Sequence, residues 1–162
     1  MKIGITSLEK CNVNKIVIPC NSITFMIKRL QRNTKIEIIN LLEKALNSIS
    51  NNGIERVCIL GSTQLWKDKL YLNINNNIKF FEINEIEQKR LSDVIENFCF
   101  SNLTTDDYNF VFHLIDKIKE SGCENILLAC TELPLILKNY PNKTNFINPT
   151  DVMIDYLMES KK

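Results

Sequence analysis

The stretch Asn125-Ile-Leu-Leu-Ala-Cys130-Thr-Glu-Leu-Pro134 passes directly from a short apolar run to a thiol, two polar side chains and a proline. A run of this length and composition is typical of a parallel strand that is buried on both faces. Thr131 is placed to cap a following helix, with Pro134 in the first turn of that helix. The stretch therefore predicts a strand, then Cys130, then a helix.

The same order of features occurs near the start of the chain. The apolar run Lys15–Pro19 is followed by Cys20, and Asn21 or Ser22 is placed to cap a helix over Ile23–Leu30. A thiol at a helix start meets unpaired backbone N–H groups, which predicts a pKa below the usual value of about 8.5. Two interpretations stay open: the two cysteines face each other across a cleft, or both are small buried hydrophobic residues.

The chain between and around these motifs alternates between short apolar runs and segments with helical periodicity. Further strands are expected over Lys35–Ile39, Arg56–Gly61 and Ile78–Glu82, and helices over Asn40–Ile49, Glu85–Phe98 and Tyr108–Glu120. This alternation predicts an α/β fold with parallel sheets and helices on both faces. Ligands of such sheets bind beyond the carboxyl ends of the strands, where both cysteines are expected.

The composition is that of a soluble globular protein. Of the 162 residues, 44% are hydrophobic and 24% are charged, which argues against disordered and fibrous folds. The net charge of +1 argues against a protein that grips phosphate backbones, so no nucleic-acid partner is expected. No apolar run reaches the roughly 18 residues of a transmembrane helix, and residues 1–12 do not resemble a secretory signal. We expect a cytoplasmic protein without a membrane partner.

The six cysteines raise the question of disulfides or a metal site. A chain of this size does not need disulfides, and thiols stay reduced in the cytoplasm. No Cys-x-x-Cys pair occurs, and the single histidine, His113, lies in the periodic stretch Phe110–Ile118, where we expect an ordinary helix residue. No metal site is expected. Four acidic residues are expected to be solvated surface charges: Glu9, Asp68, Asp106 and Asp107.

Three motifs together carry a resemblance to a known family. Ile18-Pro-Cys20-Asn-Ser22 and Leu128-Ala-Cys130-Thr-Glu-Leu-Pro134 resemble the paired signatures of the aspartate/glutamate racemase superfamily, which works without pyridoxal phosphate. The order Cys-Thr-Glu in the second motif is similar to the aspartate racemase branch. Ile59-Leu-Gly-Ser-Thr63, followed by Tyr71, is similar to the strand and loop after the crossover between the lobes of the family. The resemblance covers about Leu8 to Leu137.

The resemblance implies two pseudo-symmetric parallel-sheet lobes with flanking helices and an active site between them. Cys20 would act on one face of the substrate α-carbon and Cys130 on the other. The residues expected to bind the substrate are Asn21, Ser22, Ser62, Thr131 and Glu132, although Glu132 is also placed to interact with a helix dipole. The resemblance further implies a small amino-acid substrate of the aspartate or glutamate class, no metal or organic cofactor, and a homodimer.

The sequence also departs from the family pattern. The family's opening strand, its glycine-rich loop and a following strand with an arginine have no counterpart, so we expect an N-terminally truncated, incomplete first lobe. Met1–Thr6 resembles the opening strand but runs directly into Ser7–Cys11, which fits the helix before the Cys20 strand. We therefore divide the chain into the remnant of the first lobe (residues 1–50), the second lobe (51–137) and a C-terminal segment (138–162). The last is expected to be helical at 150–160 and to pack back on the first lobe.

Two functions follow from these observations. The first is a cofactor-independent racemase of the aspartate type, in which two cysteines transfer protons at the α-carbon. The alternative is a truncated, catalytically inactive relative that acts as an interaction module or has no activity. The lack of a basic residue near Cys99–Phe100, where aspartate racemases tend to offer a lysine, favours the alternative. Lys28, Arg29 and Arg32 either compensate for it or form a solvated helix face.

Overall fold

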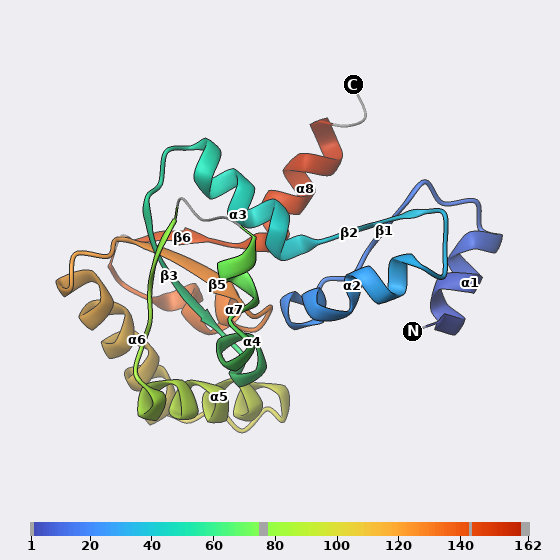
Figure 1. Ribbon diagram of the computed structural model, residues 1–162. Coiled ribbons are helices and arrows are strands. Elements are labelled where there is room, and N and C mark those ends of the chain that lie inside the picture. Colours follow the sequence, from blue (N-terminus) through green and yellow to red (C-terminus); the bar gives the residue numbers. More distant parts are fainter. Residues whose placement is uncertain (1, 75–77, 143, 160–162) are drawn as a thin grey trace.

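The computed structural model describes residues 2–74, 78–142 and 144–159, which form two parallel sheets of unequal size with helices around them (Figure 1). The strands are β1 (Lys15–Val17), β2 (Glu37–Ile39), β3 (Arg56–Gly61), β4 (Lys79–Phe81), β5 (Asn125–Ala129) and β6 (Asn145–Ile147). The α-helices are α1 (Lys2–Lys10), α2 (Thr24–Gln31), α3 (Leu41–Asn51), α4 (Thr63–Asp68), α5 (Glu85–Cys99), α6 (Thr105–Glu120), α7 (Leu133–Ile136) and α8 (Pro149–Glu159). Short 3-10 helices are η1 (Asn21–Ile23), η2 (Leu70–Asn73) and η3 (Leu137–Asn139).

Every strand pairing is parallel, as the alternation of strands and helices predicts. The smaller sheet pairs β1 with β2, with Ile16 opposite Ile38. The larger sheet has the order β4-β3-β5-β6, with Leu60 opposite Leu128 at its centre. The expected α/β class is therefore confirmed, and so is a first lobe that has only two strands among the described residues. The edge strand β6 was not predicted.

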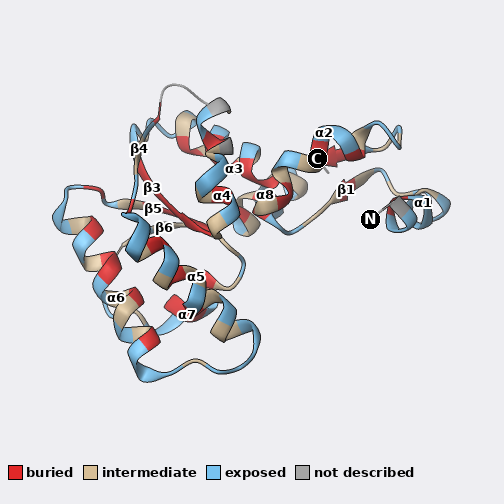
Figure 2. Cartoon of the chain, turned by 60° about the horizontal axis from the view of Figure 1, so that its bottom comes forward, coloured by how far each residue is buried: buried red, intermediate tan, exposed pale blue. Residues whose placement is uncertain are grey.

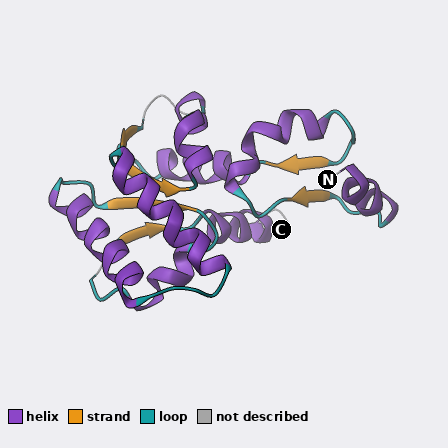
Figure 3. Ribbon diagram, turned by 90° about the horizontal axis from the view of Figure 1, so that it is seen from below, coloured by secondary structure: helices purple, strands orange, loops and turns teal. Residues whose placement is uncertain are grey.

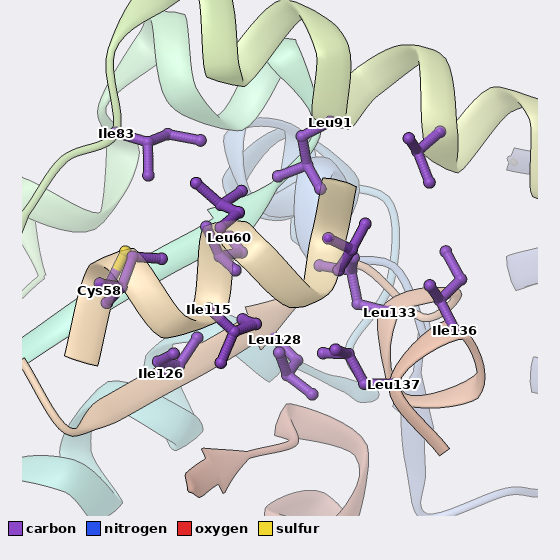
Figure 4. Close-up of a cluster of buried hydrophobic side chains, with 14 of the residues drawn as sticks. Cys58, Leu60, Ile83, Leu91, Ile115, Ile126, Leu128, Leu133, Ile136 and Leu137 are labelled. Carbon is purple, nitrogen blue, oxygen red and sulfur yellow. The ribbon is translucent and has the colours of Figure 1, made fainter. Parts of the chain in front are cut away.

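The larger sheet is buried on both faces because alternate side chains of β3 and β5 enter different cores. On one face, Cys58, Leu60, Ile126 and Leu128 pack under α5, α6 and α7 (Figure 4). The other side chains of these strands pack against α3 and the 3-10 helix η2: Val57, Ile59, Leu127 and Ala129. In Figure 2, most of the length of β3 and β5 is red, whereas the edge strands β4 and β6 are not buried.

The smaller sheet is covered by three helices. Ile16 and Ile38 pack against Ile5 of α1 and against apolar residues of α2. The opposite face presents Val17 and Ile39, which pack with Leu41, Met153, Tyr156 and Leu157. Helix α8 also lies along α3, so the same helix contacts both parts of the molecule. The residue limits of the three segments stay a prediction.

The opening residues are a helix and not a strand. Met1–Thr6 resembles a strand because Ile3 and Ile5 alternate with other residues, but α1 runs through Lys2–Lys10. Only Ile5 is buried, whereas Ile3 is 85% exposed. The two side chains lie on different faces of the helix, and α1 is held by Ile5 in the core and by a hydrogen bond from the Thr34 hydroxyl to Glu9. No described helix is both long and apolar enough to cross a lipid bilayer.

Candidate active site

The polar motifs meet where the two sheets face each other. Cys20 follows β1, Ser62 follows β3 and Cys130 follows β5, so all three lie at carboxyl ends of parallel strands. Figure 3 shows the arrows of β1 and β2 pointing toward the larger part of the molecule. The hydroxyl oxygens of Ser22 and Ser62 are 2.6 Å apart and form a hydrogen bond. This bond joins the first cysteine motif directly to the loop after β3.

The two thiols share this junction but differ in exposure. Cys20 is exposed, and Cys130 is half-buried. The charge of a Cys20 thiolate contributes to raising the pKa of Cys130, so the two sulfur atoms lie within electrostatic reach of each other. The interpretation of both cysteines as fully buried hydrophobic residues is therefore wrong.

Glu132 holds the Cys130 thiol. The Cys130 Sγ donates a hydrogen bond to Glu132 Oε2 over 2.8 Å, and the Thr131 hydroxyl donates to the same oxygen over 3.1 Å. The other carboxylate oxygen, Oε1, accepts from the Sγ of Cys99 at the end of α5, over 3.7 Å. One carboxylate thus binds two thiols and a hydroxyl.

This arrangement raises the pKa of Cys130 instead of lowering it. Burial of the thiol, followed by the hydrogen bond to the Glu132 carboxylate and its charge, raises the pKa of Cys130 to about 12. The expected depression by a helix start is wrong because α7 is only four residues long and the nearest charge is negative. Burial alone would raise the pKa of Glu132, but hydrogen bonds from Cys130, Thr131 and Cys99 lower it below its usual value. At neutral pH the pair is therefore a thiol and a carboxylate.

The predicted helix caps are wrong at both motifs. Neither Asn21 nor Ser22 caps α2, because the turn η1 lies between them and the start of α2 at Thr24. The Thr24 hydroxyl instead donates a hydrogen bond to the Asn21 carbonyl over 2.8 Å. Likewise α7 has Glu132 at its N-cap without a side-chain bond, although Pro134 lies in its first turn as predicted. Both motifs therefore leave their polar side chains available for other partners.

Asn21 is buried and incompletely satisfied. Its side chain is 3% exposed, and its Oδ1 has no hydrogen-bond partner among the described residues. A buried acceptor without a partner costs free energy. The side-chain oxygen of Asn21, next to Cys20, is thus suited to accept a hydrogen bond from a bound molecule.

Hydrogen bonds from α5 stabilise the loop that carries Ser62. Gln88, which is 2% exposed, donates to the Gly61 carbonyl over 2.9 Å, and the Thr63 and Ser92 hydroxyl oxygens are 2.5 Å apart. A Cβ at Gly61 would lie only 3.1 Å from the Ala129 carbonyl oxygen, so glycine allows the close approach of β3 and β5 here. Sequence reasoning missed Gln88 and Ser92. A polar Gln88 on the apolar stripe of α5, one turn before Leu91, was the signal available.

Other residues singled out in the sequence lie elsewhere or serve the core. His113 is exposed on α6, and Lys28, Arg29 and Arg32 are exposed on α2 and its end, which agrees with a solvated face. Tyr71 is buried, and its hydroxyl donates to Glu82. The described residues contain no group of three or more His, Cys, Asp and Glu side chains arranged to hold a metal ion.

Asp107 is not the solvated charge that was expected. It is 1% exposed and pairs with Arg90 over 2.6 Å. Burial alone would raise its pKa, but hydrogen bonds from the Thr104 backbone and hydroxyl, together with Arg90, lower it. Asp107 thus has a structural role at the start of α6.

Comparison with known proteins places this chain in a defined family of proteins. The chain belongs to the Asp/Glu/Hydantoin racemase family, whose model matches residues 4–157. It is 24% identical over 132 residues to glutamate racemase 3 of Caldanaerobacter subterraneus subsp. tengcongensis, which covers 80% of this chain and 47% of that protein. The chain therefore spans about half the length of that enzyme.

Two solved structures share the fold. The aspartate racemase homologue of Pyrococcus horikoshii OT3 aligns with a TM-score of 0.80 and 23% identity, over 98% of this chain and 71% of that chain. The aspartate racemase of Picrophilus torridus aligns with a TM-score of 0.80 and 21% identity, over 98% of this chain and 67% of that chain.

Proposed function

We propose that this chain is a cofactor-independent amino-acid racemase, similar to aspartate racemases, in which Cys20 and Cys130 exchange a proton at the substrate α-carbon. The observation that carries the proposal is that Cys20 and Cys130 both follow the carboxyl ends of strands, at the junction where Ser22 bonds to Ser62. Membership of the racemase family supports the reaction class, and the names of the two structural relatives support the aspartate branch.

Two-base racemisation needs one thiolate and one thiol at the start of a cycle. Burial and the Glu132 carboxylate keep Cys130 protonated at neutral pH, so the scheme assigns the role of the first base to Cys20, the more exposed of the two thiols. The Cys20 sulfur takes the α-proton, the electron pair of the C–H bond stays on the α-carbon, and Cys130 gives its proton to the opposite face. The cycle ends with a Cys20 thiol and a Cys130 thiolate, and the reverse reaction starts from that state.

The raised pKa of Cys130 serves the reverse direction. A thiolate whose conjugate acid has a pKa of about 12 is a stronger base than an ordinary thiolate, and the α-proton of an amino acid is only weakly acidic. The cost is that the thiolate forms 2.8 Å from a carboxylate, which favours its reprotonation. Glu132 thus acts on the reaction through Cys130.

The residues around the thiols are suited to hold an amino acid. The unpartnered Asn21 Oδ1 accepts from an ammonium group, and the Ser22 and Ser62 hydroxyls, together with Thr131, donate to a carboxylate. We infer that these four residues bind the substrate backbone. No step of this scheme uses a metal or organic cofactor.

Incorporation of solvent deuterium tests the reaction. Incubation of the chain with L- or D-amino acids in D2O is expected to replace the α-hydrogen, observed by proton NMR. Cys20→Ser and Cys130→Ser are each expected to lower the exchange at least a hundredfold, since a serine hydroxyl is a much weaker acid. Cys11→Ser, an exposed cysteine after α1, is the control and keeps the exchange. Folded wild-type chain that gives no exchange would contradict the proposal.

A second candidate is an interaction module without activity. The observation in its favour is the two-stranded β1–β2 sheet, together with exposed apolar side chains such as Ile3 and Phe25 around it. Such surfaces are commonly covered by a partner. The homodimer and the cytoplasmic location also stay predictions. Sedimentation of the purified chain measures the oligomeric state, and the isotope experiment separates this candidate from the racemase.

A further inference from the structure

A hollow opens beside the Glu132 carboxylate. Its volume is about 690 Å³, and it is lined by Phe98, Cys99, Ser101, Leu103, Tyr108 and Glu132. These residues come from the end of α5, the loop after it, the first turn of α6 and the start of α7. Phe98, Leu103 and Tyr108 are half-buried and pack on the same core as Cys130. The hollow therefore combines an apolar wall with one carboxylate.

The carboxylate brings an uncompensated negative charge to this hollow. Glu132 accepts from two thiols and one hydroxyl, which are neutral donors. None of the described residues that line the hollow is a lysine, an arginine or a histidine. Arg90, on the same helix as Cys99, is already paired with Asp107. A cationic group is thus attracted to Glu132, and a second carboxylate is repelled.

We propose that the substrate is an α-amino acid with an uncharged, apolar side chain, which lies in this hollow, and that Glu132 shares the substrate ammonium group with Asn21. This inference rests on the proposed racemase function and departs from the aspartate or glutamate class expected from the sequence. It follows from the position of the carboxylate: Oε2 binds the Cys130 thiol, and Oε1 faces Cys99 in the hollow. Glu132 therefore links Cys130 to the hollow, and an α-carbon at Cys130 has this carboxylate beside it.

The volume agrees with this class of ligand. Pockets for small molecules generally span about 300–1,000 Å³ and combine apolar walls with a few polar groups. Phe98 and Tyr108 offer aromatic faces to aliphatic or aromatic side chains. A dicarboxylic acid in the same place brings its side-chain carboxylate to an apolar wall without a cation, where its desolvation is not repaid.

A substrate panel tests the inference. The chain is incubated in D2O with methionine, leucine, phenylalanine, aspartate or glutamate at equal concentrations, and the loss of the α-hydrogen signal is followed by NMR. We expect exchange of the three apolar amino acids to exceed that of the two acidic ones at least tenfold. Faster exchange of aspartate or glutamate would overturn the substrate class and leave the racemase function in place.

If no amino acid exchanges its α-hydrogen, a binding measurement tests the apolar substrate class separately from the racemase function. Saturation-transfer NMR with the same five compounds is expected to give signals for methionine and phenylalanine that decrease in Leu103→Gln, at unchanged melting temperature. Binding without exchange would support the apolar site and contradict the racemase. Absence of both binding and exchange would overturn both.

A change of charge in the hollow provides the matched variant. Cys99→Lys places an ammonium group beside Glu132 and supplies a partner for a second carboxylate. The ratio of aspartate to methionine exchange, or of their binding signals, is expected to rise at least tenfold. Cys11→Lys adds the same charge at an exposed cysteine after α1, outside the residues that line the hollow, and is expected to leave the ratio unchanged. An equal shift in both variants would contradict the role of the hollow.

Discussion

At the scale of single residues, the site depends on the contrast between two thiols. Cys20 is exposed, whereas Cys130 is half-buried and bound to a carboxylate. The repeat of a strand followed by a cysteine identified both thiols in the sequence. The sign of the pKa shift at Cys130 was not predictable, because it depends on burial and on the direction in which the Glu132 side chain points. Cys99 was missed because 33 positions separate it from Glu132 in sequence.

Replacement of Glu132 by glutamine tests this pKa directly. The hydrogen bond and charge of the carboxylate favour the neutral thiol, so Glu132→Gln is expected to lower the pKa of Cys130, while burial keeps it above the usual value. A lower pKa means more thiolate at pH 9, and the rate of alkylation of Cys130 by iodoacetamide is expected to rise several-fold. Mass spectrometry of alkylated peptides over pH 7–11 measures the rate for each cysteine.

Exposed Glu124 offers the control for that experiment, since Glu124→Gln removes the same charge elsewhere on the surface. In the wild-type chain, Cys20 is expected to react before Cys130, because Cys20 is exposed, whereas Cys130 is half-buried and hydrogen-bonded to Glu132. Unchanged alkylation of Cys130 in Glu132→Gln would show that the carboxylate does not control the thiol.

At the scale of elements, the sequence predicts the strands that are buried on both faces and misses the edge strand that is not. Strands β3 and β5 have the predicted limits, since an apolar run between two helical layers has one arrangement that buries it. The edge strand β6 has three half-buried or exposed residues and no such run. The sequence did not decide between a strand and a helix for the opening residues, because both explain a single buried isoleucine equally well. The predicted cap of α2 is absent because the 3-10 turn η1, in which the Ile23 N–H donates to the Cys20 carbonyl, precedes the helix.

The starts of α5 and α6 provide a prediction at this scale. Both begin with a reciprocal capping box, Asn84 with Glu87 and Thr104 with Asp107. Asn84→Ala is expected to lower the free energy of unfolding by about 1 kcal/mol. Thr104→Ala is expected to cost more, about 2–3 kcal/mol, because the buried Asp107 also loses the hydroxyl donor.

Urea unfolding measures both values. Thr105→Ala, at the next and exposed position, is the matched control and is expected to change the free energy by less than about 0.5 kcal/mol. Equal effects of Asn84→Ala and Thr104→Ala would indicate that the bond to buried Asp107 adds nothing to the cap.

At the scale of the whole molecule, helix α8 joins the two sheets. It packs along α3, and its Met153 lies with Ile39 and Leu41 on the face of the small sheet that α1 and α2 leave open. Tyr156 adds a bond from Lys15 over 3.3 Å and a cation–π contact with Lys44. The position of the small sheet, and of Cys20 after β1, relative to the larger sheet therefore depends on a helix that contributes no residue to the site.

Met153→Ala tests this coupling. Met153 is 3% exposed, and its truncation is expected to lower the free energy of unfolding by about 2–4 kcal/mol. Hydrogen exchange of the β1 and β2 amides is expected to rise more than that of β3 and β5. Met158→Ala, 61% exposed on the same helix, is expected to change neither quantity. A uniform increase in exchange throughout the chain would contradict a specific role in seating the small sheet.

The same contact imposes an order on biosynthesis. Val17 and Ile39 emerge early from the ribosome, but Met153 and Leu157, against which they pack, are translated near the end of these 162 residues. Domains generally fold as units while translation proceeds. One apolar face of the nascent β1–β2 unit therefore stays exposed until α8 has been translated. That waiting period is when a chaperone has its best opportunity to bind.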